Sequence, residues 1–108
     1  MPHSYRLDPD AEQELAEAMA WYDAERAGVG RDLLDEVHAI AQHAAAFPDS
    51  GELIRSLPLR HEFRRFLLKV FPYALIARVQ PGELAILAVA HQHRKPRYWR
   101  KRVAKIPP

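Results

Sequence analysis

The sequence contains no cysteine, which excludes disulfide bonds and thiolate metal sites and gives no indication of an oxidising compartment. It contains no apolar run close to the roughly 20 residues that are needed to span a bilayer. Its N-terminus also lacks the basic and then apolar pattern of a signal peptide. These absences predict a cytoplasmic protein that makes no contact with a membrane.

Common catalytic motifs are absent as well. The sequence has no Gly-rich phosphate loop and no His-Glu-x-x-His zinc pattern. Outside the N-terminal tail its only serines are Ser50 and Ser56, and neither lies in a nucleophile-elbow setting. His38 and His43 are five residues apart, so a helix would not place them on one face. We therefore expect no metal site and no cofactor.

The chain has 108 residues, of which 48% are hydrophobic and 28% charged, and this predicts one globular domain over residues 1–108. Its net charge of +2 conceals an uneven distribution. Residues 1–50 carry three Arg and eleven Asp or Glu, a net charge of −8, whereas residues 51–108 carry thirteen Lys or Arg and three acids, a net charge of +10. Such a chain attracts polyanions or acidic proteins. The alternative is that its two halves only neutralise each other.

Two helices are expected in the first half, after a short strand-like segment at Tyr5-Arg-Leu7. Asp8-Pro9 marks the start of the first helix, since Asp caps free amides and Pro is tolerated at the first helical position. Apolar residues recur at helical spacing in both helices, and Trp21 beside the first set is expected to pack. The two sets are Ala11, Leu15, Ala18 and Tyr22, then Leu33, Val37, Ile40, Ala44 and Phe47. Gly28-Val-Gly30 separates the helices and Pro48 ends the second, which predicts an antiparallel hairpin.

Apolar residues alternate in the second half, which is typical of strands. We expect strands over residues 57–63, 66–70 and 75–79, and a fourth over the apolar run 84–90, buried on both faces in the middle of the sheet. The expected connections are Arg64-Arg65, Phe71-Pro72 and Gln80-Pro-Gly-Glu83. The predicted fold is therefore α+β: an N-terminal strand, a two-helix antiparallel hairpin packed on one face of an antiparallel sheet of about four strands, and a short basic C-terminal helix or tail.

Basic and aromatic side chains dominate the end of the chain. Arg94, Tyr98 and Arg102 recur at intervals of four residues, so a helical tail would place them on one face. Such a surface suits contact with RNA, or metal-independent RNA cleavage by Arg, His and Tyr. It suits an acidic protein partner equally well. In the remaining alternative, Tyr98 and Trp99 fold back to cap the sheet.

The order of these elements resembles the RelE/ParE superfamily of toxins from bacterial type II toxin–antitoxin systems. The resemblance is carried by Trp21-Tyr22, Gly28-Val-Gly30, Phe71-Pro72-Tyr73, and Ala88-Val-Ala-His91 followed by Arg94, Tyr98, Trp99 and Arg102. It implies a basic groove that is covered by an acidic segment of a cognate antitoxin, in a hetero-oligomer. The side chains expected to contact the antitoxin or the target are Arg60, Arg64, Arg65, Lys69, His91, His93, Arg94, Arg97, Tyr98 and Arg102.

Members of this superfamily differ in their target. RelE-type proteins cut mRNA on the ribosome, whereas ParE-type proteins poison DNA gyrase. For a nuclease, the resemblance assigns catalysis to Arg65, His91, Arg94 and Tyr98. However, three positions at which the RelE pattern expects a cation are neutral, namely Leu67, Ala74 and Gln92. The resemblance therefore favours a gyrase poison, with a ribosome-dependent endoribonuclease and a non-toxic binding module as alternatives.

Overall fold

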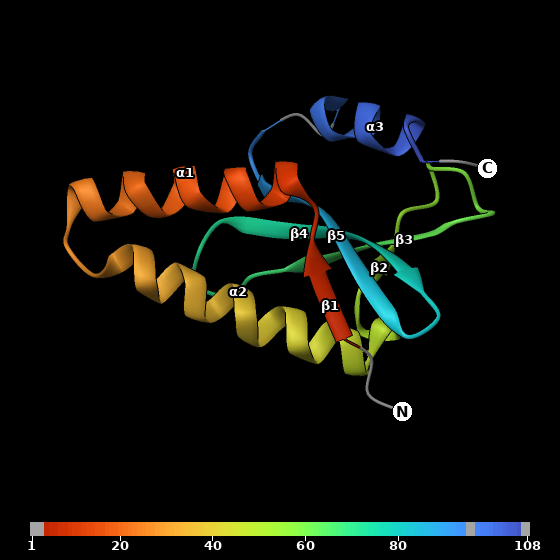
Figure 1. Ribbon diagram of the computed structural model, residues 1–108, viewed down its shortest axis with the longest axis horizontal. Coiled ribbons are helices and arrows are strands. Elements are labelled where there is room, and N and C mark those ends of the chain that lie inside the picture. The colour runs from red at the N-terminus through yellow and green to blue at the C-terminus, as the bar shows by residue number, and fades with distance from the viewer. Residues whose placement is uncertain (1–3, 95–96, 107–108) are drawn as a thin grey trace.

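A computed structural model describes residues 4–94 and 97–106, without the side chain of Arg97 (Figure 1). The elements in chain order are β1 (Ser4–Leu7), α1 (Pro9–Glu25), α2 (Val29–Ala46), the single 3₁₀ turn η1 (Pro48–Ser50), β2 (Glu52–Leu53), β3 (Glu62–Leu67), β4 (Tyr73–Gln80), β5 (Glu83–His91) and α3 (Arg97–Ala104). None of the described helices is long and apolar enough to span a membrane.

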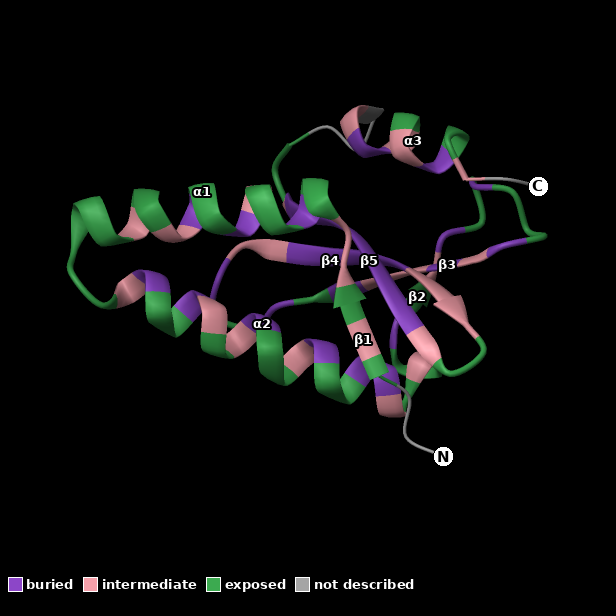
Figure 2. Cartoon of the chain, in the orientation of Figure 1, coloured by how far each residue is buried: buried purple, intermediate pink, exposed green. Residues whose placement is uncertain are grey.

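The five strands form one sheet in the order β1-β5-β4-β3-β2. β1 runs parallel to β5, and every other pair is antiparallel. The prediction of an α+β fold with a largely antiparallel sheet is thus confirmed, with one additional strand. The prediction of a buried strand inside the sheet is also confirmed, because β5 lies between β1 and β4 and is buried from Leu84 to Ala90 (Figure 2), although β4 and not β5 is the central strand.

The helical hairpin covers one face of the sheet. Buried residues of α1 and α2, among them Leu15 and Leu33, pack against Leu75 of β4 and Ile86 of β5. Trp21, which was expected to pack, is instead 61% exposed. The adjacent Tyr22 turns inward, because neighbouring residues of a helix point in directions about 100° apart and only one of the pair reaches the sheet.

The turn between the two helices depends on two glycines. Gly28 has a φ angle of +92°, a backbone conformation that is strained for any residue with a side chain. A Cβ atom on Gly30 would lie 2.6 Å from the carbonyl oxygen of Met19, so Gly30 allows the two helices to approach closely. These contacts explain why Gly28-Val-Gly30 marks the break between the helices.

The structure corrects the first two predicted strands. Arg64 and Arg65 are not a turn but lie in the middle of β3. Leu57, Leu59 and His61 belong to a loop that precedes β3, whereas Phe63 lies in β3. The predicted strand over residues 66–70 is the end of β3 and the loop that follows it. Two adjacent arginines are tolerated within a strand because each has an acidic partner: Arg64 binds Glu62 at 2.6 Å, and Arg65 binds Glu52 of β2 at 2.9 Å.

The connection between β3 and β4 is held by one carboxylate of α2. Glu36 accepts hydrogen bonds from the backbone N–H groups of Lys69, Val70 and Phe71, each at 3.0 Å. A carboxylate that accepts several backbone N–H groups forms charge-assisted bonds, which are stronger than neutral ones. The helical hairpin therefore fixes the loop that leads into β4.

The opposite face of the sheet is covered by the C-terminal helix α3. Trp99 and Val103 of α3 pack against Phe63, Ile76 and Leu87 in a second apolar cluster. Trp99 is only 1% exposed, so this residue belongs to the core. Helix α3 thus forms a third layer, and the side chains around Trp99 are held in fixed positions above the ends of β4 and β5.

Candidate functional site: a groove at the end of β5

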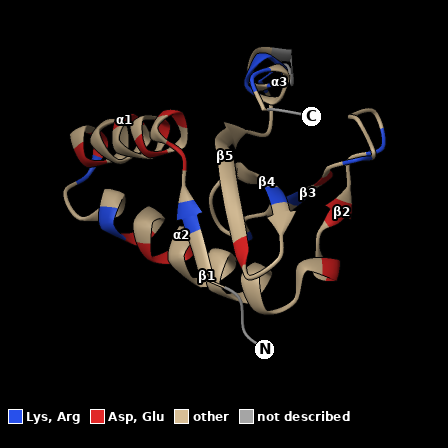
Figure 3. Cartoon of the chain, turned by 45° about the vertical axis from the view of Figure 1, so that its right-hand side comes forward, with Lys and Arg blue, Asp and Glu red and all other residues tan. Residues whose placement is uncertain are grey.

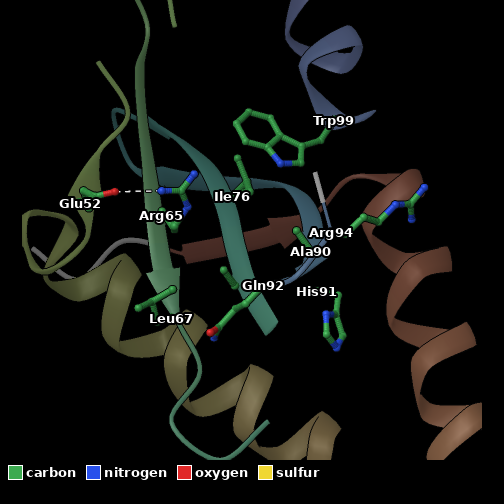
Figure 4. A pocket seen from close by; sticks show the side chains of 10 residues that line it. Glu52, Arg65, Leu67, Ile76, Ala90, His91, Gln92, Arg94 and Trp99 are labelled. Atoms are coloured by element: carbon green, nitrogen blue, oxygen red, sulfur yellow. Dashed lines mark hydrogen bonds and ion pairs between the residues drawn. The ribbon is translucent and has the colours of Figure 1, made fainter. Parts of the chain in front are cut away.

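A groove of about 440 Å³ lies where β5 ends, on the face of the sheet that α3 covers (Figure 4). Side chains from β3, β4, β5 and α3 surround it because alternate residues of paired strands share one face. The residues that line it are Glu52, Arg65, Leu67, Ala74, Ile76, Ala90, His91, Gln92, Arg94 and Trp99.

The floor of the groove is apolar. It includes Ala74 and Ile76 of β4. These two residues pair with Leu67 and Arg65 of β3. Trp99 closes the groove from above in Figure 4, while Leu67 at its rim is 58% exposed. The three neutral residues at which a nuclease of the RelE pattern would carry cations, Leu67, Ala74 and Gln92, all line this one groove.

Polar side chains surround the floor, among them Arg65, His91 and Arg94. The Nη1 atom of Arg65 donates to Glu52 at 2.9 Å. The Nδ1 atom of His91 accepts a hydrogen bond from the backbone N–H of His93 at 3.2 Å, and its ring packs edge-on against Tyr73. In Figure 4, His91 and Arg94 lie on the side of the groove opposite Arg65. The groove therefore combines an apolar floor with hydrogen-bond donors at both rims.

A second hollow of about 230 Å³ adjoins the groove and shares His91 and Arg94 with it. Its lining residues are Glu14, Glu17, Ala18, Trp21, Tyr73, Val89, His91, Arg94 and Tyr98. Helix α1 therefore contributes to this surface, which the sequence analysis did not foresee. The signal was present in Trp21-Tyr22, because a helix with one apolar stripe buries only one of two adjacent aromatic residues.

Tyr98 lies between two guanidinium groups. The Cζ atom of Arg94 is 3.8 Å from the centre of the Tyr98 ring, and that of Arg102 is 5.3 Å from it. Burial, together with the adjacent Glu14 carboxylate, raises the pKa of the Tyr98 phenol far above its ordinary value, although both arginines oppose this shift. The phenol therefore stays protonated at physiological pH.

Several of the predicted contact residues have partners within the protein. Arg102 donates to both oxygens of Glu14, at 2.8 and 3.2 Å, and Arg64 donates to the Gly51 carbonyl oxygen as well as to Glu62. The acidic helix α1 and the basic helix α3 (Figure 3) thus neutralise each other in part.

Arg64 and Arg102 thus have partners within the protein, and the other predicted contact residues differ in position. Arg65, His91 and Arg94 line the groove, and Tyr98 lines the second hollow. Outside both hollows lie the exposed residues Arg60, Lys69 and His93. The side chain of Arg97 lies outside the described residues. Across the described part of the chain, no group of three or more His, Cys, Asp or Glu is arranged to hold a metal ion.

Comparison with known proteins matches this chain to a family model and to solved structures. A family model described as the ParE toxin of the type II toxin–antitoxin system, parDE, matches residues 5–96. A solved chain from a chromosomal ParDE toxin–antitoxin system of P. aeruginosa superposes with a TM-score of 0.69 at 15% identity, and covers 83% of this chain and 96% of that one. A search of curated proteins finds no match. The structural likeness shows the shared fold, and the family match ends at the residue before α3 begins.

Proposed function

Because this chain belongs to the family of ParE toxins of type II toxin–antitoxin systems, we propose that it arrests growth by poisoning DNA gyrase in the cytoplasm. We propose further that a cognate antitoxin neutralises it by covering the groove at the end of β5 and the adjoining hollow, in a hetero-oligomer. Both interactions are contacts between proteins and require no cofactor.

One observation carries this proposal: three positions in the groove at which the RelE pattern expects a cation hold neutral side chains. Cleavage of RNA places negative charge on the phosphate in the transition state, and donors aimed at that charge contribute about 3 kcal/mol each. Leu67, Ala74 and Gln92 provide no positive charge at three places in the groove. An apolar floor with an exposed Leu67 instead matches the anatomy of a protein interface.

The state of Tyr98 supports the same conclusion. A phenol removes a proton from a 2′-hydroxyl only when it is ionised. The raised pKa of Tyr98 keeps this phenol neutral, and Arg94 covers one face of its ring. A tyrosine that holds its proton and stacks on arginine favours a binding role over base catalysis.

A supercoiling assay with purified gyrase tests the proposal. We expect the purified chain to inhibit supercoiling and to trap cleaved DNA in complex with gyrase. The variant Leu67→Asp, which places a charge on the exposed apolar rim, should weaken inhibition, whereas Leu59→Asp should not. Leu59 is a matched control because it is 68% exposed and lies outside the groove. Full supercoiling activity in the presence of the wild-type chain would contradict the proposal.

A ribosome-dependent endoribonuclease remains the second candidate, because His91, Arg94 and Tyr98 line one hollow. These three residue types can exchange protons and stabilise a phosphorane without a metal. Primer extension on a translated mRNA tests this candidate, since toxin-dependent cuts that disappear in His91→Ala would establish it. Induced expression that leaves growth unaffected would instead favour a binding module without toxicity.

A further inference from the structure

We propose that the groove binds a bulky apolar side chain of the antitoxin that is adjacent to an Asp or Glu, and that Glu52 occupies the position of this acid until the antitoxin binds. The inference rests on the proposed function, because the segment that enters the groove belongs to the antitoxin. It adds the chemistry of that segment and assigns a role to Glu52.

The apolar side chain of the proposed antitoxin segment is inferred from the shape of the groove. Its volume of about 440 Å³ lies between Ile76 on the floor, Trp99 above and Leu67 at the rim. Phe66 is buried, whereas Leu67 points to the opposite face of the sheet and is 58% exposed. Large apolar residues that border a concave surface mark contacts with a partner, because the partner side chain removes both surfaces from water. An aromatic or long aliphatic side chain fits these conditions.

The adjacent Asp or Glu of the proposed antitoxin segment is inferred from the charges around the groove. Arg65 and Arg94 provide two cations at its rims, and among the described residues that line it Glu52 alone carries a carboxylate. Arg65 donates to Glu52 through Nη1, so one of its five N–H groups is used in this bond. A guanidinium fork binds a carboxylate best through two parallel hydrogen bonds. A partner that carries Asp or Glu can therefore form a bidentate pair with Arg65.

Glu52 is placed so that a partner can displace it at low cost. It lies on β2, which is only two residues long, and its side chain is 71% exposed. Exposed ion pairs contribute little to stability, so exchange of one carboxylate for another at Arg65 is nearly neutral. Figure 4 shows the Glu52 carboxylate reaching Arg65 at the edge of the groove. The ion pair thus keeps Arg65 in position without closing the groove.

Two synthetic peptides test this inference. The probes are Ac-Ser-Glu-Phe-Glu-Ser-NH2 and its counterpart with Gln in place of both Glu, each titrated into the purified full chain while backbone amide NMR signals are followed. We expect the acidic peptide to shift the signals of Leu67, Ala90 and Gln92 and to bind more tightly than the neutral peptide. Absence of shifts at these residues up to millimolar concentrations would overturn the inference.

Substitutions at Glu52 and Arg65 test whether the acid of the peptide competes with Glu52 for Arg65. Glu52→Gln should tighten binding of the acidic peptide about threefold, which is the scale of an exposed ion pair. Glu62→Gln is the matched control, since it removes the same charge from a residue that binds Arg64 and does not line the groove. Arg65→Gln should reduce the preference for the acidic peptide to the part that Arg94 contributes. An equal effect of Glu52→Gln and Glu62→Gln would rule out competition by Glu52.

Failure of this inference is distinguishable from failure of the proposed function. The peptide titration measures binding to the groove of the purified chain, whereas the supercoiling assay measures inhibition of gyrase. If gyrase is inhibited but the two peptides bind alike, the inference is wrong while the proposed function stands. If the acidic peptide binds selectively but gyrase is unaffected, the target assignment is wrong and the chemistry of the groove stands.

Discussion

Arg102 of α3 and Glu14 of α1 form a two-bond ion pair across 88 residues of sequence, with distances of 2.8 and 3.2 Å. The same two side chains continue the hydrogen bonding of β5 beyond the end of β1, whose strand pairing stops at Ile86. Arg102 donates to the carbonyl oxygen of Leu87 at 2.9 Å, and Glu14 accepts from the N–H of Val89 at 3.1 Å. An ion pair thus occupies the place of the missing strand residues and joins the first helix to the last.

Removal of Glu14 should therefore destabilise the protein more than removal of an ordinary surface acid. Glu14→Ala removes the nearest carboxylate from the guanidinium of Arg102, which is 20% exposed, and leaves the N–H of Val89 without its acceptor. We expect a loss of roughly 3 kcal/mol in the free energy of unfolding, measured by urea denaturation. Asp35→Ala removes the partner of Arg31 in an exposed ion pair and should cost about 0.5 kcal/mol. Equal losses would contradict the role given to Glu14.

The two tryptophans should report on different parts of the molecule. Trp99 is 1% exposed beneath α3, whereas Trp21 is 61% exposed on α1. Trp21→Phe should therefore shift fluorescence emission to shorter wavelength and leave stability nearly unchanged. Trp99→Ala should cost about 3–5 kcal/mol because it removes the largest side chain of the second cluster. In the Trp21→Phe variant only Trp99 emits. If its emission wavelength is that of free tryptophan in water, α3 is not packed on the sheet.

Stability should fall in alkaline solution, and Tyr98 should account for part of the fall. The folded state raises the pKa of Tyr98, so it holds the phenolic proton more tightly than the unfolded chain does. The contribution of Tyr98 to the free energy of unfolding is complete well below pH 10, the ordinary pKa of a phenol. It decreases as the pH rises past that value, because the phenol of the unfolded chain ionises first. In Tyr98→Phe, the free energy of unfolding should depend less steeply on pH between about 9 and 11.

This pH dependence should not vanish in Tyr98→Phe. Burial also raises the pKa of Tyr5 and Tyr73, so these two phenols act in the same direction. Absorbance of the phenolate during an alkaline titration gives an independent check, since wild type and variant differ by one phenol. Identical slopes in the two proteins would contradict the assignment to Tyr98.

Glu36 should hold the loop between β3 and β4. Glu36→Ala removes the acceptor of three backbone N–H groups, and we expect a loss of about 2 kcal/mol in stability. The amides of Lys69, Val70 and Phe71 should then exchange with solvent faster than in the wild type. Hydrogen exchange followed by NMR measures this directly, and unchanged exchange at these three amides would argue against the anchor.

The helices and the central strand could be predicted because their signals are local. The stripe of Leu33 and Val37 requires only helical periodicity, and the run from Leu84 to Ala90 requires only burial on both faces. The strand around Arg64 and Arg65 could not be predicted in this way, since two adjacent cations also suit a turn. What makes them tolerable in β3 is acidic partners in the sheet, including Glu52, thirteen residues from Arg65.

The sequence by itself determined which segments are apolar, where the helices begin and end, and that the last strand is buried, because these properties depend on neighbouring residues. Only the tertiary structure decided which cations line the groove. Arg65 and Arg94 reach the groove, whereas Arg102 is turned inward by Glu14. That choice depends on strand register and on the docking of α3 against α1, which bring together side chains from opposite ends of the chain.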